Sequence, residues 1–156
     1  MAEKPDFKTE YDKLKNKYSL PDFKELNNEL ELGDLDKKEF LLRAIRRKMR
    51  DKLIFFCRIL EGVLYPTDKS PLTAYESSFF TEDAKYHLST IHKTMMTFDR
   101  RSLLLDVEDT DEKNATYIKD LWKHWQPFKQ ETSSVIVTME KSWNHHEKEH
   151  AQGYFG

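Results

Sequence analysis

The sequence contains one cysteine, Cys57, so it has neither a disulfide framework nor a cluster of thiolate metal ligands. A lone cysteine is typical of a reducing setting, and we expect a cytoplasmic protein. Glycine occurs four times and proline five times among 156 residues. Because turns depend on these two residues, their scarcity predicts few turns and long helices rather than short strands.

Long apolar runs are also missing. The longest is Leu53–Cys57, whereas a membrane span needs about 20 apolar residues. The first ten residues are polar and lack the apolar core of a signal peptide. A net charge of −2 gives the whole molecule no attraction to nucleic acid or anionic lipid. Any such binding would depend on a local patch, and no membrane contact is expected.

Apolar side chains that recur every three or four residues predict an all-α fold. We expect a helical bundle of three long helices plus two or three short ones. With 38% hydrophobic and 35% charged residues, a chain of this length supports one core. The expected organisation is a single helical-bundle domain over residues 1–144, followed by a flexible C-terminal tail over residues 145–156.

The first long helix is expected to run from about Asp34 to Leu64, after a short helix that Gly33 ends. The second is expected to follow an N-cap at Thr81, whose hydroxyl can accept a hydrogen bond from the first helical turn. The acidic turn after that helix offers Asp109 or Thr110 as the N-cap of the third.

The third long helix is expected to start near Asp111 and to contain Pro127. Its apolar residues stay in one angular sector on both sides of the proline: Ala115, Ile118, Trp122, Trp125, Thr132, Ile136, Met139 and Trp143. A break in the helix would move the apolar residues after Pro127 to a different sector. One kinked helix is therefore favoured over two separate ones. Pro127 then faces solvent, where water satisfies the freed carbonyl of Lys123.

The sequence His146-Glu147-Lys148-Glu149-His150 matches the H-E-x-x-H pattern of zinc peptidases. Only six residues follow it, which leaves little room for a third ligand, and its two central residues are charged. A solvated, histidine-rich tail is the favoured interpretation. Glu147 and His150 also have the spacing of a di-iron carboxylate site, but such a site needs a second pair of this kind. We therefore expect no metal, no cofactor and no catalytic residues.

A basic stripe on the first long helix consists of Arg43, Arg46, Arg47 and Arg50. These side chains fall on the arc opposite the apolar face, where they could neutralise several phosphates of RNA or DNA. The other interpretation is an ordinary solvated face whose charges pair within the chain. Aromatic residues that would stack on single-stranded bases are not interleaved with the arginines.

Lys52 departs from the pattern of the same helix because it falls within the apolar arc. Its alkyl stem could run along that surface and place the ammonium group in water. Alternatively, it could form a buried ion pair with Asp99 or Asp106. Either arrangement would be structural.

The aromatic face of the third long helix, with Trp122, Trp125 and Phe128, offers a candidate contact surface. A small bundle has little mass with which to cover so many rings, and an uncovered aromatic patch is typical of a protein-binding surface. We expect either a homodimer or a protein partner docked near these residues.

Several segments resemble small conserved archaeal helical proteins of unknown function. They are residues 19–23 (SLPDF), 39–48 (EFLLRAIRRK), 58–61 (RILE) before Pro66, 75–76 (YE) and 128–129 (FK). The resemblance covers most of the chain, implies a cytoplasmic setting and suggests no activity. Pro127 and the histidine-rich tail depart from it.

No glycine-rich phosphate loop, C-x-x-C pair or G-x-S-x-G elbow is present in the sequence. The sequence therefore favours a non-enzymatic interaction or scaffold module. The alternative is a nucleic-acid-binding or ribosome-associated protein that uses the basic stripe from Arg43 to Arg50.

Overall fold

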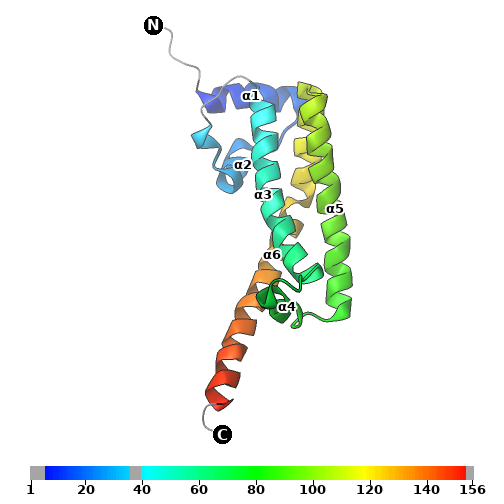
Figure 1. Ribbon diagram of the computed structural model, residues 1–156. Helices are drawn as coiled ribbons and strands as arrows, with labels where there is room; N and C mark the ends of the chain where they lie inside the picture. The colour runs from blue at the N-terminus through cyan, green and yellow to red at the C-terminus, as the bar shows by residue number, and fades with distance from the viewer. Residues whose placement is uncertain (1–5, 36–39, 154–156) are drawn as a thin grey trace. The chain divides into compact units, whose positions relative to one another are not determined.

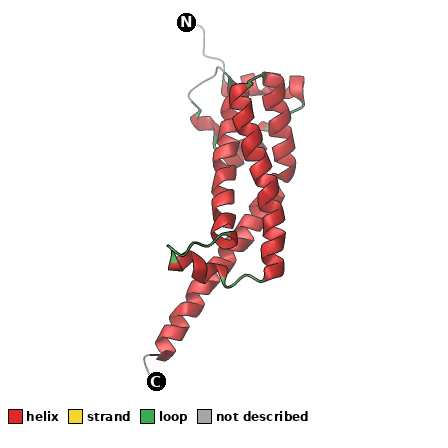
Figure 2. Ribbon diagram, turned by 45° about the vertical axis from the view of Figure 1, so that its right-hand side comes forward, coloured by secondary structure: helices red, strands yellow, loops and turns green. Residues whose placement is uncertain are grey.

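The computed structural model describes residues 6–35 and 40–153, with only the backbone described for residues 34 and 146–153. Its elements in chain order are α1 (Phe7–Tyr18), α2 (Phe23–Leu30), the 3₁₀ helix η1 (Leu32–Asp34), α3 (Leu41–Leu64), α4 (Pro71–Ser77), α5 (Glu82–Val107) and α6 (Asp111–Gly153). The described residues contain no strand (Figure 2). The all-α prediction is confirmed, with α3, α5 and α6 as the three long helices (Figure 1).

The short N-terminal helices end at residues with left-handed backbone. Ser19 (φ 56°) terminates α1, and Glu31 (φ 52°) terminates α2. The prediction that Gly33 ends α2 is therefore wrong by two residues, since Gly33 lies inside η1. At the other end of α2, a carboxylate oxygen of Asp22 accepts a hydrogen bond from the Lys24 amide at 2.9 Å, which caps the helix.

The start of α3 also differs from the prediction. The helix begins at Leu41 rather than near Asp34, because Leu35 is extended and Phe40 has a φ of 60°. A residue at positive φ lies outside the right-handed helical region, so α3 does not extend through Phe40. Residues 36–39, which fall inside the expected helix, lie outside the described residues.

The N-caps predicted for α5 and α6 are confirmed. The hydroxyl of Thr81 accepts a hydrogen bond from the Ala84 amide at 3.1 Å, and that of Thr110 accepts one from the Lys113 amide at 3.2 Å. Of the two candidates for α6, Thr110 is the cap. Acidic residues in the first turn of each helix complement the helix dipole.

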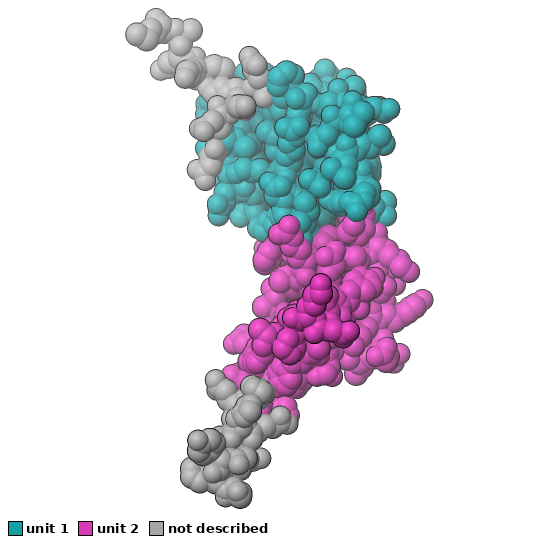
Figure 3. Space-filling view, in the orientation of Figure 1, with its two compact units in different colours: residues 1–54, 97–125 teal, residues 55–96, 126–156 magenta. Residues whose placement is uncertain are grey.

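The chain packs as two compact units (Figure 3). Unit 1 comprises residues 1–54 and 97–125, and unit 2 comprises residues 55–96 and 126–156. The sequence predicted one domain over residues 1–144, whereas the unit boundaries fall inside α3, α5 and α6. Each long helix therefore contributes residues to both units.

The buried face of α6 alternates in steps of four and three residues. Besides Ala115 and Tyr117 near the start of the helix, its members are Asn114, Ile118, Leu121, Trp125, Phe128, Thr132, Val135 and Ser142. This face is displaced from the predicted sector, because Leu121, Phe128 and Val135 are buried in place of Trp122 and Ile136, which is 39% exposed. Pro127 lies inside α6 and is exposed, so the prediction of one helix with a solvent-facing proline is confirmed.

Substitution of Pro127 by alanine is expected to stabilise the protein. The change restores an amide that can donate to the carbonyl of Lys123, and it should raise the free energy of unfolding by about 1–3 kcal/mol. Urea denaturation followed by circular dichroism measures the change. The neighbouring exposed residue provides the control, since Gln126→Ala should shift stability by no more than about 0.5 kcal/mol. Destabilisation by Pro127→Ala would show that the native backbone at this position requires proline.

Candidate functional site

The arginine stripe of α3 is exposed at Arg47, half-buried at Arg43 and Arg50, and buried at Arg46. Arg46 is 0% exposed and belongs to a buried series with Leu42, Met49 and Leu53, again spaced by four and three residues. The expectation of a solvated stripe opposite the core is therefore wrong at this position. The helix is covered on two sides, because the C-terminal half of α5 packs along the arginines.

The guanidinium of Arg46 is held by groups from α5 and α6. Its Nε donates to Oδ1 of Asn114 at 2.6 Å, and its Nη1 donates to the carbonyl and the hydroxyl of Ser102 at 2.8 and 2.7 Å. Its Nη2 donates to Oδ1 of Asp106 at 2.5 Å. We call Arg46, Ser102, Asp106 and Asn114 the Arg46 cluster. It joins the three long helices within unit 1.

The other arginines of the stripe pair with aspartates. Arg47 shares Asp106 with Arg46 at 3.2 Å, Arg50 donates to Asp99 at 2.9 Å, and Arg43 forms an ion pair with Asp109. Three carboxylates along the end of α5 and the following turn thus face four guanidinium groups. The positive charge that suggested nucleic-acid binding is largely neutralised within the chain.

Asn114 extends the cluster into the turn before α6. Its side-chain amide donates to the Asp109 carboxylate and, at 2.8 Å, to the carbonyl of Thr110. Asn114 therefore accepts from Arg46 with its oxygen and tethers the α5–α6 turn with its nitrogen. This arrangement ties the turn, and with it Asp109, to the Arg46 cluster.

Asp106 is stabilised as a carboxylate. Desolvation by burial acts to raise its pKa, but the hydrogen bonds and charges of Arg46 and then Arg47 together outweigh that effect. The pKa of Asp106 therefore lies below its ordinary value. Nearby, burial raises the pKa of the Tyr117 hydroxyl to about 12. Near neutral pH, Asp106 is therefore ionised and Tyr117 is protonated. Groups that exchange protons in catalysis have a pKa near the working pH, so both side chains have the properties of structural groups.

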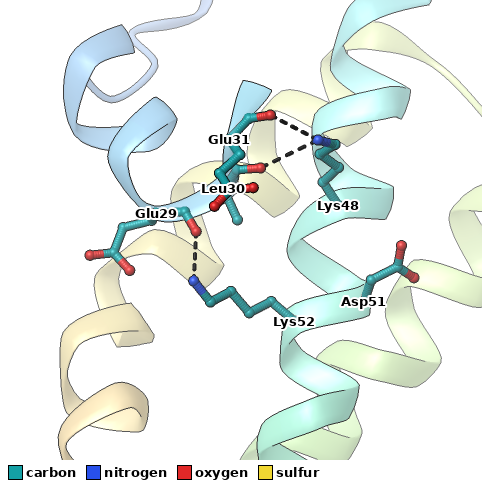
Figure 4. A pocket seen from close by; sticks show the side chains of 6 residues that line it. All are labelled: Glu29, Leu30, Glu31, Lys48, Asp51 and Lys52. Atoms are coloured by element: carbon teal, nitrogen blue, oxygen red, sulfur yellow. Dashed lines mark hydrogen bonds between the residues drawn. The ribbon is translucent and has the colours of Figure 1, made fainter. Parts of the chain in front are cut away.

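Lys52 and Lys48 cap the C-terminus of α2 (Figure 4). The Lys52 ammonium group donates to the carbonyl of Glu29 at 2.6 Å, and that of Lys48 donates to the carbonyls of Leu30 and Glu31 at 3.4 and 2.9 Å. These are carbonyls at a helix end, which lack the next helical amide. The alternative of a buried ion pair between Lys52 and Asp99 or Asp106 is not formed, since both aspartates bind arginines.

A cavity of about 330 Å³ lies beside these lysines, and the acidic Asp51 also lines it (Figure 4). Both ammonium groups are already bound to backbone carbonyls. The cavity is therefore part of the junction between α2 and α3 rather than a reactive centre.

The aromatic residues expected at a contact surface are mostly buried. Trp125 is 0% exposed and donates its indole N–H to Oε2 of Glu29 at 3.2 Å, and Phe128 is 3% exposed. Trp122 is half-buried, with its ring stacked 6.2 Å from that of Trp125. The expectation of an uncovered aromatic patch at Trp122–Phe128 is wrong, because the chain itself covers two of the three side chains.

Exposed apolar side chains occur on several elements, and three of them share one face of α5. Leu103, Leu104 and Val107 are 40%, 55% and 82% exposed and follow the exposed Arg100 at intervals typical of one helix face. We call Arg100, Leu103, Leu104 and Val107 the α5 outer stripe. It lies opposite the buried face of Phe98, Ser102 and Leu105. The spacing of these four residues in the sequence could have revealed it.

A groove of about 320 Å³ runs along the edge of the α5 outer stripe. Leu104 and Leu105 contribute its apolar surface, and Arg101, Glu108 and Glu112 are among its polar residues. These residues come from the C-terminal part of α5, the turn after it and the start of α6, all within residues 97–125 of unit 1. The groove is large enough for an aliphatic side chain.

The histidine-rich segment lies at the C-terminal end of α6. The backbone of α6 continues to Gly153, beyond the expected end of helix near His145, but the side chains of His146, Glu147 and His150 lie outside the described residues. Among the side chains that are described, no three His, Cys, Asp or Glu residues could share a metal ion.

No family model matches the chain, and neither a curated protein nor a solved structure shows significant similarity to it. None of the helices in the described part of the chain is both long and apolar enough to cross a membrane.

Replacement of Arg46 is expected to destabilise the protein far more than replacement of its neighbour. Arg46→Met leaves the buried oxygens of Ser102 and Asn114 without their donor, and should cost about 3 kcal/mol in the free energy of unfolding. Arg47→Met is the matched control, since Arg47 pairs with the same aspartate but is 56% exposed, and should cost no more than about 0.5 kcal/mol. Chemical denaturation measures both, and equal costs would contradict a structural role for the buried cluster.

The lowered pKa of Asp106 predicts an acid-sensitive contribution to stability. A carboxyl group whose folded pKa is depressed stabilises the protein fully above its unfolded pKa of about 4, and this stabilisation is lost as the pH falls through the folded pKa. The stability difference between wild type and Asp106→Asn should therefore be constant near neutral pH and shrink below about pH 4. Denaturation midpoints between pH 7 and pH 2 test this expectation, and a difference independent of pH would refute it.

Proposed function

We propose that the protein is a non-enzymatic helical interaction module that docks a protein through the α5 outer stripe. The observation that carries this proposal is the exposure of Leu104 and Val107, at 55% and 82%, on a helix whose other face is already buried. Helices that are apolar on both faces are usually covered on both sides.

The arrangement of the stripe supports docking more than isolated exposure would. Single exposed apolar residues are common on proteins and need no explanation. Here, however, three of them are neighbours on one helix face, and a groove with apolar walls adjoins Leu104. Contiguous apolar surface flanked by charged residues is typical of protein-binding sites. The stripe thus replaces the buried Trp122–Phe128 face as the proposed contact surface.

Nucleic-acid or ribosome association through Arg43–Arg50 has less support. Phosphates would have to displace the aspartates that hold Arg43, Arg46 and Arg50, and Arg46 is inaccessible. An enzymatic role also has little support, since the polar groups of the Arg46 cluster bind one another. Protein docking uses surface that the fold leaves open.

A binding comparison between matched variants tests the proposal. Tagged wild type, Leu104→Glu and Leu72→Glu are incubated with native extract, with and without nuclease, and retained proteins are identified by mass spectrometry. Leu72 is a suitable control because it is 58% exposed but lies on α4. We expect defined proteins, including the chain itself, to bind wild type and Leu72→Glu at least about tenfold better than Leu104→Glu, because a buried carboxylate opposes docking.

The opposite result is equally informative. Retention that is the same for Leu104→Glu and wild type would refute docking through the α5 outer stripe. Retention that depends on nucleic acid would favour the basic stripe of α3. Circular dichroism of each variant checks that the helices are intact.

A further inference from the structure

The α5 outer stripe carries opposite charges at its two ends. Arg100, which is 66% exposed and pairs with Asp99, lies at the N-terminal end with Arg101, which pairs with Asp120. Glu108, which is 58% exposed and pairs with Lys113, lies with Glu112 at the C-terminal end, beyond Val107. Because Arg100 and Glu108 are more than half exposed, their ion pairs within the chain are weak and leave both side chains open to a partner. An identical stripe running in the opposite direction would therefore place each cationic end against an anionic end. A parallel copy would place like charges together.

We propose that the stripe binds a second copy of this chain, with the two α5 segments antiparallel and a two-fold axis passing near Leu104. This inference rests on the proposed function and names its partner. In such an isologous contact each residue meets its counterpart in reverse order. Leu104 then faces Leu104 of the second copy, and Arg100 faces Glu108 of the second copy.

The groove beside Leu104 fits this arrangement. With the axis near Leu104, Val107 of the second copy lies opposite Arg101, which lines the groove together with Leu104 and Leu105. Val107 is 82% exposed and makes little contact with its own chain. Its branched side chain is small relative to a groove of about 320 Å³. Two-fold symmetry places one valine in each of two equivalent grooves.

The size of the stripe makes the association weak. The helix from Arg100 to Val107 is about 10 Å long at 1.5 Å per residue. A contact centred on so short a segment is smaller than the interface of a permanent dimer. We therefore expect a dissociation constant between about 1 µM and 1 mM. The monomer and the dimer then coexist, and a change in concentration shifts the balance between them.

Reversal of the charges at the two ends of the stripe, with the dimerisation constant measured by sedimentation equilibrium, tests the proposal. The full chain is measured from about 10 µM to about 1 mM as wild type, Arg100→Glu, Glu108→Arg and the double variant. Each single variant brings like charges together and should weaken dimerisation at least about tenfold. The double variant restores opposite charges across the axis and should return to within about threefold of wild type. Leu72→Glu is the control and should dimerise as wild type does.

Rescue by the double variant is specific to the antiparallel arrangement, because a parallel pair would still oppose like charges. Leu104→Cys adds a geometric test, since a residue at the axis should form an intermolecular disulfide under mild oxidation while Leu72→Cys should not. Cys57 is buried and does not compete. A wild type that is monomeric up to about 1 mM, a dimer insensitive to the single charge reversals, or failure of the double variant would overturn the proposal.

The outcome is separable from that of the proposed function. A monomeric chain that still retains a different protein through Leu104 would remove the second copy as partner and leave docking through the stripe intact. Loss of both self-association and Leu104-dependent retention would remove both proposals.

Discussion

The buried guanidinium of Arg46 constrains the packing of unit 1. A charged group that is fully removed from water is tolerated only where acceptors surround it. Here the acceptors come from Ser102 and Asp106 on α5 and from Asn114 on α6. A shift of either helix by one turn along α3 would deprive the guanidinium of the acceptors that this helix supplies. The cluster therefore specifies the register of the three helices in this unit, as single polar residues do in the cores of helical bundles.

The same constraint determines which surfaces are open. Because Asp99, Asp106 and Asp109 hold the arginines of α3, the polar side of α5 faces inward along with Phe98 and Leu105. The orientation of α5 about its own axis that makes these contacts leaves Leu104 and Val107 exposed on the opposite side. The α5 outer stripe is thus a consequence of burying the Arg46 cluster, and the charge that suggested phosphate binding serves internal packing instead.

Local signals in the sequence predicted the elements well. Apolar periodicity, the threonine N-caps and the phase on both sides of Pro127 all depend on residues within one or two helical turns of each other. The errors also have local causes. Phe40 adopts positive φ, which no periodicity reveals, and the alternation of apolar residues on α6 was compatible with two adjacent faces. The observed face with Leu121, Phe128 and Val135 is the one that meets neighbouring helices.

The sequence by itself determined the fold class, the three long helices and the continuity of α6, because these follow from interactions between residues close along the chain. Only the tertiary structure decided the roles of Arg46, Lys52 and Trp125. Their partners are far away in sequence, with Ser102, Asp106 and Asn114 lying 56 to 68 residues beyond Arg46. A helical face can be read as charged or apolar from its sequence, but whether it is buried depends on which helices pack against it. The physical reason is that charge neutralisation and burial are properties of assembled helices.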